Sequence, residues 1–133
     1  MSDEQRVISL RQECGLVVPW NNPAKDIERK LKVCADLFLI GEIDGNLVAT
    51  VMGGYDGHRG WINYLAIHPD YRRRGYGRQI MEAVEQRIDQ KGCPKINLQV
   101  RAGNDEAVTF YQRLGYSDDN VIGLGKRLID DTL

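Results

Sequence analysis

The clearest pattern of apolar and polar positions along the chain predicts an amphipathic helix over residues 75–91. Its apolar residues recur four positions apart, which places them on one face of a helix, and charged residues occupy the opposite face. The apolar stripe consists of Tyr76, Ile80, Val84 and Ile88. Weaker patterns predict helices over residues 4–14 and 24–33, and a last helix that Asn104 caps and Gly115 ends.

Apolar segments without a helical period predict strands between these helices. We expect strands over residues 36–43, 46–52, 61–68, 95–101 and 121–129, with a hairpin turn at Asp44-Gly45 between the first two. The order is helix, helix, β-hairpin, strand, helix, strand, helix and strand. This order is typical of an α/β (α+β) fold with helices packed on a mixed sheet, and we expect residues 1–133 to form one domain.

Composition limits the partners of this chain. The formal net charge of its 133 residues is −1, so no broad basic field is available for nucleic acid, and no apolar run approaches the length of a membrane span. The first residues lack the layout of a signal peptide, so we expect a cytoplasmic protein. The three cysteines are odd in number and widely spaced, as is usual for reduced thiols, and with only two histidines no metal-binding cluster is expected.

The segment from Ile62 to Arg78 carries the candidate chemistry. An apolar strand stops at His68-Pro69, and three arginines, Gly75-Tyr76-Gly77 and the start of a helix follow. Glycines let backbone N–H groups approach a phosphate, and a helix start adds unpaired donors and a partial positive charge. The order of strand, glycine-rich loop and helix therefore predicts an anion-binding site.

Two motifs resemble those of the GNAT N-acetyltransferases. Arg72-Arg73-Arg74-Gly75-Tyr76-Gly77 matches every fixed position of the family's acetyl-CoA signature, Gln/Arg-x-x-Gly-x-Gly/Ala. Residues 104–116 are similar to a second family pattern, N-x-x-A-x-x-F-Y-x-x-x-G-F/Y. The order of elements resembles the GNAT fold too, except that the family's first strand is missing or shortened here. Four segments are similar to the YpeA-type bacterial branch, whose acceptor is not settled: PWNNPAKDIERK, MGGYDGHRG, KGCPKI and LGKRLI.

The resemblance implies direct transfer of an acetyl group from acetyl-CoA to a primary amine on a small molecule, peptide or protein. It implies a mostly antiparallel central sheet with helices on both faces, and a homodimer is compatible with that fold. Tyr111 would be the general acid that protonates the leaving thiolate. The pyrophosphate would bind the loop before the helix, with only some of the arginines, and the pantetheine arm the strand before it. The implied cofactor-binding residues are Leu65, Ala66, Ile67, Arg72, Arg73, Arg74, Gly75, Tyr76, Gly77, Arg78 and Asn104.

The sequence does not identify a general base. At neutral pH a lysine side chain (pKa about 10.4) is almost wholly protonated, whereas an α-amine (pKa about 7.7–8.0) is roughly one-tenth free, so a lysine acceptor needs more help. Residues 61–67 contain no carboxylate, and Gln99, which is no base, stands where the ribosomal-protein N-terminal acetyltransferases place a glutamate. The candidates are Glu42, Asp56, His58 and a chain of waters.

Acceptor specificity is expected from the loops at residues 19–23 and 55–60, because loops on a rigid scaffold usually carry this role. Trp20 belongs either to the core or to a pocket wall. The acidic residues near these loops, Asp26, Glu28 and Asp56, would favour a cationic acceptor. Acetyl is the family's usual acyl group, and a longer chain would need only a roomier cleft.

Two other functions remain open at this point. One is a non-catalytic acyl-CoA-binding module of the same fold, which the missing strand carboxylate favours and Tyr111 opposes. The other is RNA binding, in which the arginines and Tyr76 would stack on bases, and the net charge opposes this interpretation.

Overall fold

The computed structural model describes residues 2–132 and contains a four-stranded sheet in the order β1-β2-β3-β4. Its strands are β1 (Phe38–Ile43), β2 (Asn46–Tyr55), β3 (Gly60–Ile67) and β4 (Ile96–Leu98). The first three strands pair antiparallel, and β4 pairs parallel to β3 after a crossover through helix α3 (Tyr76–Gln90). The predicted mixed, mostly antiparallel sheet is confirmed.

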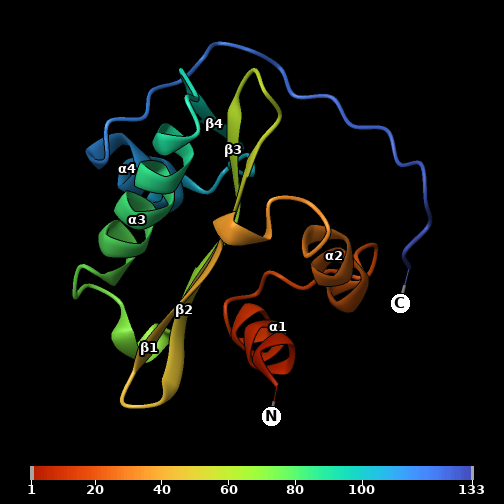
Figure 1. Cartoon of the computed structure of the whole chain (residues 1–133), viewed down its shortest axis with the longest axis vertical. Helices are drawn as coiled ribbons and strands as arrows, with labels where there is room; N and C mark the ends of the chain where they lie inside the picture. Colours follow the sequence, from red (N-terminus) through yellow and green to blue (C-terminus); the bar gives the residue numbers. More distant parts are fainter. Residues whose placement is uncertain (1, 133) are drawn as a thin grey trace.

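Helices cover both faces of this sheet. Figure 1 shows α1 (Asp3–Glu13) and α2 (Pro23–Lys30) on one side and α3 and α4 (Asp105–Arg113) on the other. Ser2, Asn22 and Asn104 each cap a helix by accepting a hydrogen bond from a backbone N–H of its first turn. Within residues 2–132 no strand precedes α1, as expected from the departure from the family pattern.

The main core lies between α3 and the sheet. The predicted stripe of α3 is confirmed, since Ile80, Val84 and Ile88 are buried there together with Met81. Leu37 belongs to the same cluster and lies in a 3₁₀ turn (Ala35–Leu37) that occupies the start of the predicted first strand. No helix in the described part of the chain is both long enough and apolar enough to cross a membrane.

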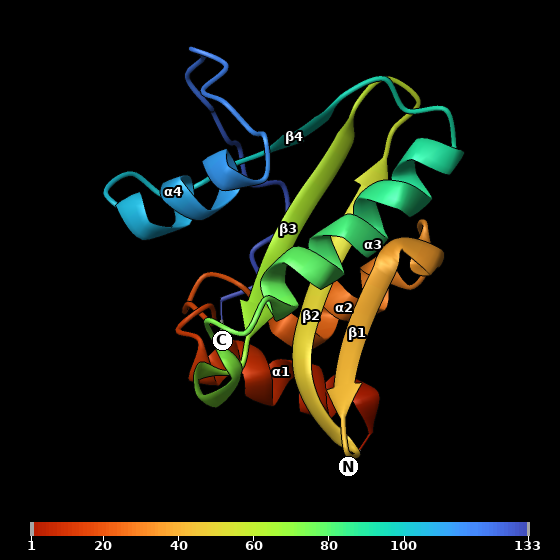
Figure 2. The ribbon, with the colours of Figure 1, turned by 90° about the vertical axis from the view of Figure 1, so that its left-hand side faces the viewer.

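The strands β3 and β4 separate soon after they begin to pair. They are joined only from Gly60 to Ile62 on β3 and from Ile96 to Leu98 on β4. Figure 2 shows β4 leading away from β3 toward α4. On its other edge, β3 has a register shift against β2 opposite Thr50 to Met52, and Tyr64 has a left-handed backbone with φ of 52°. The second half of β3 is therefore open on the side of β4.

The predicted helix over residues 24–33 ends earlier, at Lys30. Leu31, expected on its inner face, forms the C-cap and is 60% exposed, and Val33 is 62% exposed. Only Ile27 of the predicted inner face is buried. The expectation for Leu31 was wrong because the chain turns toward β1 before the stripe completes another turn.

The predicted strand over residues 121–129 is also wrong. The segment pairs with no strand and crosses from α4 to the side of α2 (Figure 1). The neighbouring edge strand β4 is three residues long and offers few backbone partners. Side chains hold the end of the segment instead, because Arg127 donates to Asn21 and Asp131 accepts from Arg29.

Gly53 of β2 gives a test of the main core. A Cβ atom there would lie 2.7 Å from Cγ2 of Val84 and 3.1 Å from the carbonyl oxygen of Leu37. We expect Gly53→Ala to lower the free energy of unfolding by about 1–3 kcal/mol, because a packed core must shift to admit the methyl group. Urea denaturation measures this change.

The matched control is Gly54→Ala in the same strand. Its Cβ would meet nothing nearer than Nζ of Lys30, at 3.5 Å. We expect a change within about 0.5 kcal/mol. Equal destabilisation by both substitutions would contradict the contact between α3 and β2 as the cause.

Candidate active site

The loop between β3 and α3 exposes the first N–H groups of α3. Gly75 is the N-cap residue, with φ of 83°, and no side chain caps the helix at this end. A left-handed backbone at this position favours glycine, since it carries no Cβ. The unpaired donors and the positive end of the helix dipole make a site that fits a pyrophosphate. The predicted anion-binding geometry is therefore present.

Two of the arginines in this segment have structural contacts. Nε of Arg72 donates to the carbonyl oxygen of Ile67 at 3.1 Å and ties the loop to the end of β3. Nη2 of Arg78 donates to the carbonyl oxygen of Arg113 at 3.3 Å and ties α3 to the end of α4. These two side chains position the loop and the helices around it.

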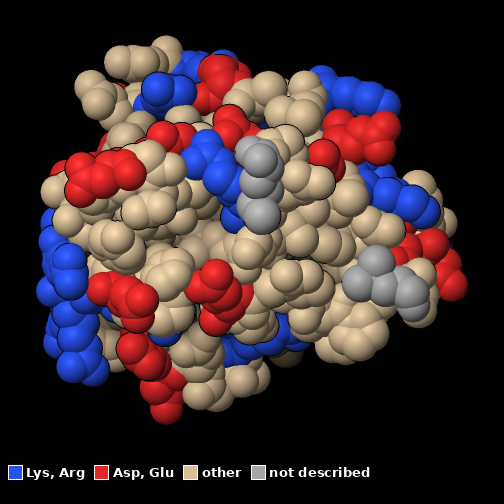
Figure 3. Space-filling view, turned by 90° about the horizontal axis from the view of Figure 1, so that it is seen from below, with Lys and Arg blue, Asp and Glu red and all other residues tan. Residues whose placement is uncertain are grey.

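Arg73 and Arg74 are the arginines that remain free for an anion. Neither side chain makes a hydrogen bond or an ion pair with another residue in the described part of the chain, and Arg74 lies over the ring of Tyr71 at 5.4 Å. Figure 3 shows Lys and Arg gathered along the left edge of its view, the side on which this loop lies in Figure 1. Elsewhere on that face acidic and basic residues are intermixed. The basic site is local, as the net charge predicts.

Gly77 has a different role from Gly75. A Cβ atom at Gly77 would lie 3.0 Å from Cζ of Phe110 and 3.7 Å from Cγ1 of Ile67. The missing side chain lets α4 pack closely on the first turn of α3. Both glycines are expected to contact phosphate through the backbone, and Gly77 in addition allows the close packing of the two helices.

Tyr111 of α4 is half-buried and packs against the main core. Its ring contacts those of Phe110 and Tyr116 at 5.1 and 5.8 Å, and the Tyr116 hydroxyl donates to Glu85 at 2.5 Å. Burial raises the pKa of Tyr111 to about 12. Its hydroxyl carries a proton at neutral pH, as that of an exposed tyrosine does, and the raised pKa makes it a weaker acid. Asn104, implied to lie near the cofactor, uses its side-chain oxygen to cap α4.

The segment from Leu65 to Ile67 lies on the open half of β3. Ala66 is buried, and the other two side chains pack against the main core. The strand edge that faces away from β2 has no ladder partner here. The structure thus combines packed side chains with a backbone edge that has no strand partner, although the carbonyl oxygen of Ile67 accepts from Arg72 and Cys14.

The three candidate bases do not lie on this open half. Glu42 is on β1, at the opposite edge of the sheet, and accepts from Arg6 at 2.9 Å. Asp56 lies in the turn before β3 with His58 and accepts hydrogen bonds from two backbone N–H groups of that turn, which lower its pKa. That turn is at the end of β3 that still pairs with β4.

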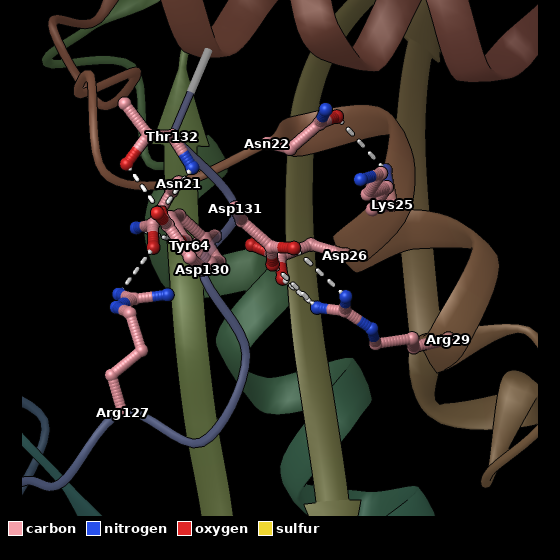
Figure 4. A network of polar contacts seen from close by, with 10 residues as sticks. All are labelled: Asn21, Asn22, Lys25, Asp26, Arg29, Tyr64, Arg127, Asp130, Asp131 and Thr132. Atoms are coloured by element: carbon pink, nitrogen blue, oxygen red, sulfur yellow. Dashed lines mark hydrogen bonds and ion pairs between the residues drawn. The ribbon is translucent and has the colours of Figure 1, made fainter.

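A polar network on the α1–α2 side of β3 was not predicted from the sequence. Figure 4 shows Tyr64 of β3 beside Asn21, whose amide donates to the Tyr64 hydroxyl at 3.0 Å. Burial raises the pKa of Tyr64, and the nearby carboxylate of Asp26 raises it further. The C-terminal segment closes the network through Arg127 and Asp131. These residues come from three distant segments, so no local pattern could identify the group.

Trp20 belongs to this side of the molecule and not to the core. It is 48% exposed, and the guanidinium of Arg101 lies 5.7 Å from its ring. Arg101 follows the separating strand β4. The exposure of Trp20 excludes the core interpretation, and the pocket-wall interpretation stays a prediction.

Comparisons with known proteins agree with this geometry. A family model described as "Acetyltransferase (GNAT) family" matches residues 5–116. Acetyltransferase SG1711 of Sodalis glossinidius is 50% identical over 130 residues, which cover 97% of this chain and 92% of the relative.

Solved structures show the same fold at low sequence identity. The structure of AAC(6')-Iy with the bisubstrate analogue CoA-S-monomethyl-acetylneamine has a TM-score of 0.76 at 21% identity, covering 93% of this chain and 91% of that one. The ribosomal-protein-S18-alanine N-acetyltransferase of Escherichia coli has a TM-score of 0.70 at 23% identity, covering 85% of this chain and 70% of that one.

The pKa of Tyr111 gives a test that needs no substrate. We expect the difference between the alkaline absorbance titrations of wild type and Tyr111→Phe to have its midpoint near pH 12. Because the folded pKa lies above the unfolded value of about 10, the contribution of Tyr111 to stability is complete below about pH 10 and is lost as the pH rises toward 12.

The same difference titration in urea is the control, with an expected midpoint of about 10 for an exposed tyrosine. Coincident midpoints in the folded and unfolded chains would mean that Tyr111 is not buried as described.

Proposed function

Because the chain belongs to the GNAT family of acetyltransferases, we propose that it transfers an acetyl group from acetyl-CoA to a primary amine, with Tyr111 as general acid. The observation that carries this proposal is the uncapped start of α3 directly after the open half of β3. It offers anion-binding donors and a free strand edge in sequence, and Tyr111 is half-buried in the adjoining helix.

Each part of acetyl-CoA has matching residues in this proposal. The N–H groups of Tyr76, Gly77 and Arg78 and the side chains of Arg73 and Arg74 would bind the pyrophosphate. The backbone of residues 65–67 would bind the pantetheine arm through the edge that β4 leaves free. Arg72 would hold the loop against β3 without contacting phosphate, because its Nε is bonded to Ile67.

The reaction requires a proton to be supplied at sulfur. The amine nitrogen forms a bond to the carbonyl carbon, the carbon–sulfur bond breaks, and the nitrogen loses a proton. The Tyr111 hydroxyl would donate a proton to the leaving thiolate. This hydroxyl carries a proton at neutral pH, since its pKa is about 12, and its half-buried position limits the water that would compete for the bond.

Removal of the Tyr111 hydroxyl tests the proposed acid. We expect Tyr111→Phe to lower kcat about 100-fold, a typical contribution of general acid catalysis, and to leave acetyl-CoA affinity close to that of wild type. CoA release across a panel of amines measures the first quantity and calorimetry the second. Wild-type kcat in the variant would remove Tyr111 from the mechanism, and CoA release from no amine despite acetyl-CoA binding would favour a non-catalytic module.

Charge reversal in the loop tests the proposed pyrophosphate site. We expect Arg73→Glu or Arg74→Glu to weaken acetyl-CoA binding by about 10- to 100-fold, since hydrogen bonds to charged groups are lost and repulsion is added. Lys32→Glu is the control, because it makes the same charge change at an exposed residue after α2. Unchanged calorimetric affinity in both loop variants would move the pyrophosphate to another site.

A further inference from the structure

A buried cation without a partner lies beside Tyr64. Arg11 of α1 is 1% exposed, and its guanidinium lies 4.3 Å from the ring centroid of Tyr64 and 5.7 Å from that of Phe38. Among the residues that the structure describes, Nε and Nη2 of Arg11 have no hydrogen-bond partner. Buried donors of this kind are costly to leave unpaired, so they indicate a place where a water or a ligand atom completes the bonding.

Arg11 lines a small pocket under the loop that joins α1 and α2. Asn21, Asp26 and Tyr64 supply its other polar walls. Its volume is about 10 Å³, close to the space that one water oxygen needs. A ligand can therefore insert one oxygen atom beside Arg11 in place of a water, while the rest of the ligand remains outside.

Asp26 gives this pocket a second, opposite charge. Nη1 of Arg29 lies 3.6 Å from Asp26, but the two Nη atoms of Arg29 are bonded to the buried Asp131 at 2.6 and 2.9 Å (Figure 4). The charge of Arg29 is thus directed mainly to Asp131. The side chain of Asp26 is 27% exposed and retains the capacity to accept hydrogen bonds from a cation.

The pocket adjoins the part of the cleft where acyl transfer would occur. Tyr64 directly precedes Leu65 on the open half of β3, and its left-handed backbone lies at the register shift of that strand. The Tyr64 ring stacks on Arg11, and its hydroxyl is held by Asn21. An amine bound at Asp26 would therefore lie on the α1–α2 side of the strand edge proposed to bind acetyl-CoA.

We propose that this pocket is the acceptor subsite and takes an α-amine whose neighbouring carbon bears a carbonyl or carboxylate oxygen. Asp26 binds the ammonium group and takes up its proton, which leaves the nitrogen lone pair free for the attack, and Arg11 binds the oxygen. Free amino acids and peptide N-termini share this chemistry, whereas lysine side chains and polyamines have no oxygen at that spacing. The proposal rests on the proposed acetyltransferase function, and it agrees with a site whose strands lack a carboxylate, because an α-amine is partly deprotonated at neutral pH.

Two matched amines test the oxygen contact. Alaninamide carries the carbonyl oxygen, and 2-aminobutane replaces its amide group by an ethyl group of similar size. The α-amine has a pKa of about 7.7–8.0 and an alkylamine about 10.4, so kcat/KM is expressed per free amine. On that scale we expect wild type to favour alaninamide by about 10- to 100-fold. Arg11→Met retains the approximate volume of the side chain and removes its donors, so it should abolish this preference.

Asp26→Asn tests the ammonium contact independently of the buried arginine. We expect kcat/KM for both amines to fall by about tenfold or more, with acetyl-CoA affinity unchanged, since an ammonium loses its charged partner. Glu28→Gln is the matched control, because Glu28 is exposed on the same helix and does not line the pocket. If Arg11→Met fails to fold, the wild-type preference and the Asp26→Asn comparison still decide the proposal.

Free alanine, alaninamide and an alanine-led tetrapeptide then separate the two sources of the α-amine. A higher kcat/KM for alanine would identify the acceptor as a free amino acid. A higher kcat/KM for the tetrapeptide would identify it as a peptide N-terminus. Equal kcat/KM per free amine for alaninamide and 2-aminobutane in wild type, or an intact preference in Arg11→Met, would overturn the subsite while CoA release from those amines upholds the proposed function. CoA release from no amine, with acetyl-CoA bound, would overturn both.

Discussion

The close contact between α3 and the sheet determines where every functional group lies. Val84 packs where Gly53 leaves no room for a side chain, and this fixes the height of α3 on β2. The start of α3 then lies just past the end of β3, so its unpaired N–H groups follow the open half of that strand. Gly77 has the same effect between two helices, because its missing side chain lets Phe110 of α4 approach α3. That contact positions Tyr111, which follows Phe110.

Features with a local cause could be predicted from the sequence. The stripe of α3, the hairpin turn at Asp44-Gly45 and the cap at Asn104 depend on neighbours within a few positions, and all three are present in the structure. The early end of α2 and the unpaired segment at residues 121–129 depend on partners distant in sequence. The apolar residues of that segment resemble a strand, but β4 is too short to pair with it.

The features of the candidate site also fall into those that a local sequence pattern predicted and those that depend on distant contacts. The motif at residues 72–77 led to the expected anion site, and the separate pattern at residues 104–116 led to Tyr111, because each pattern lies within one short stretch of backbone. The sequence could not predict which arginines bond to the protein and which remain free for an anion. The outcome depends on whether a carbonyl oxygen such as that of Ile67 lies within reach of the side chain. The role of Arg11 was not predicted, because a charged residue in a helix usually faces solvent. A buried arginine is an exception to this pattern, and such exceptions are often found at functional sites.

The two faces of the sheet supply opposite parts of the proposed chemistry. On the α3–α4 face, the hydroxyl of Tyr111 carries the proton proposed for the leaving group. On the α1–α2 face, the carboxylate of Asp26 can accept hydrogen bonds from a polar ligand, and the guanidinium of Arg11 can donate them. In the proposed reaction the separation of β4 from β3 would let a thioester reach both faces, since a continuous ladder would close the sheet between them. The short pairing of these two strands is thus what allows one cleft to handle both protons of the transfer.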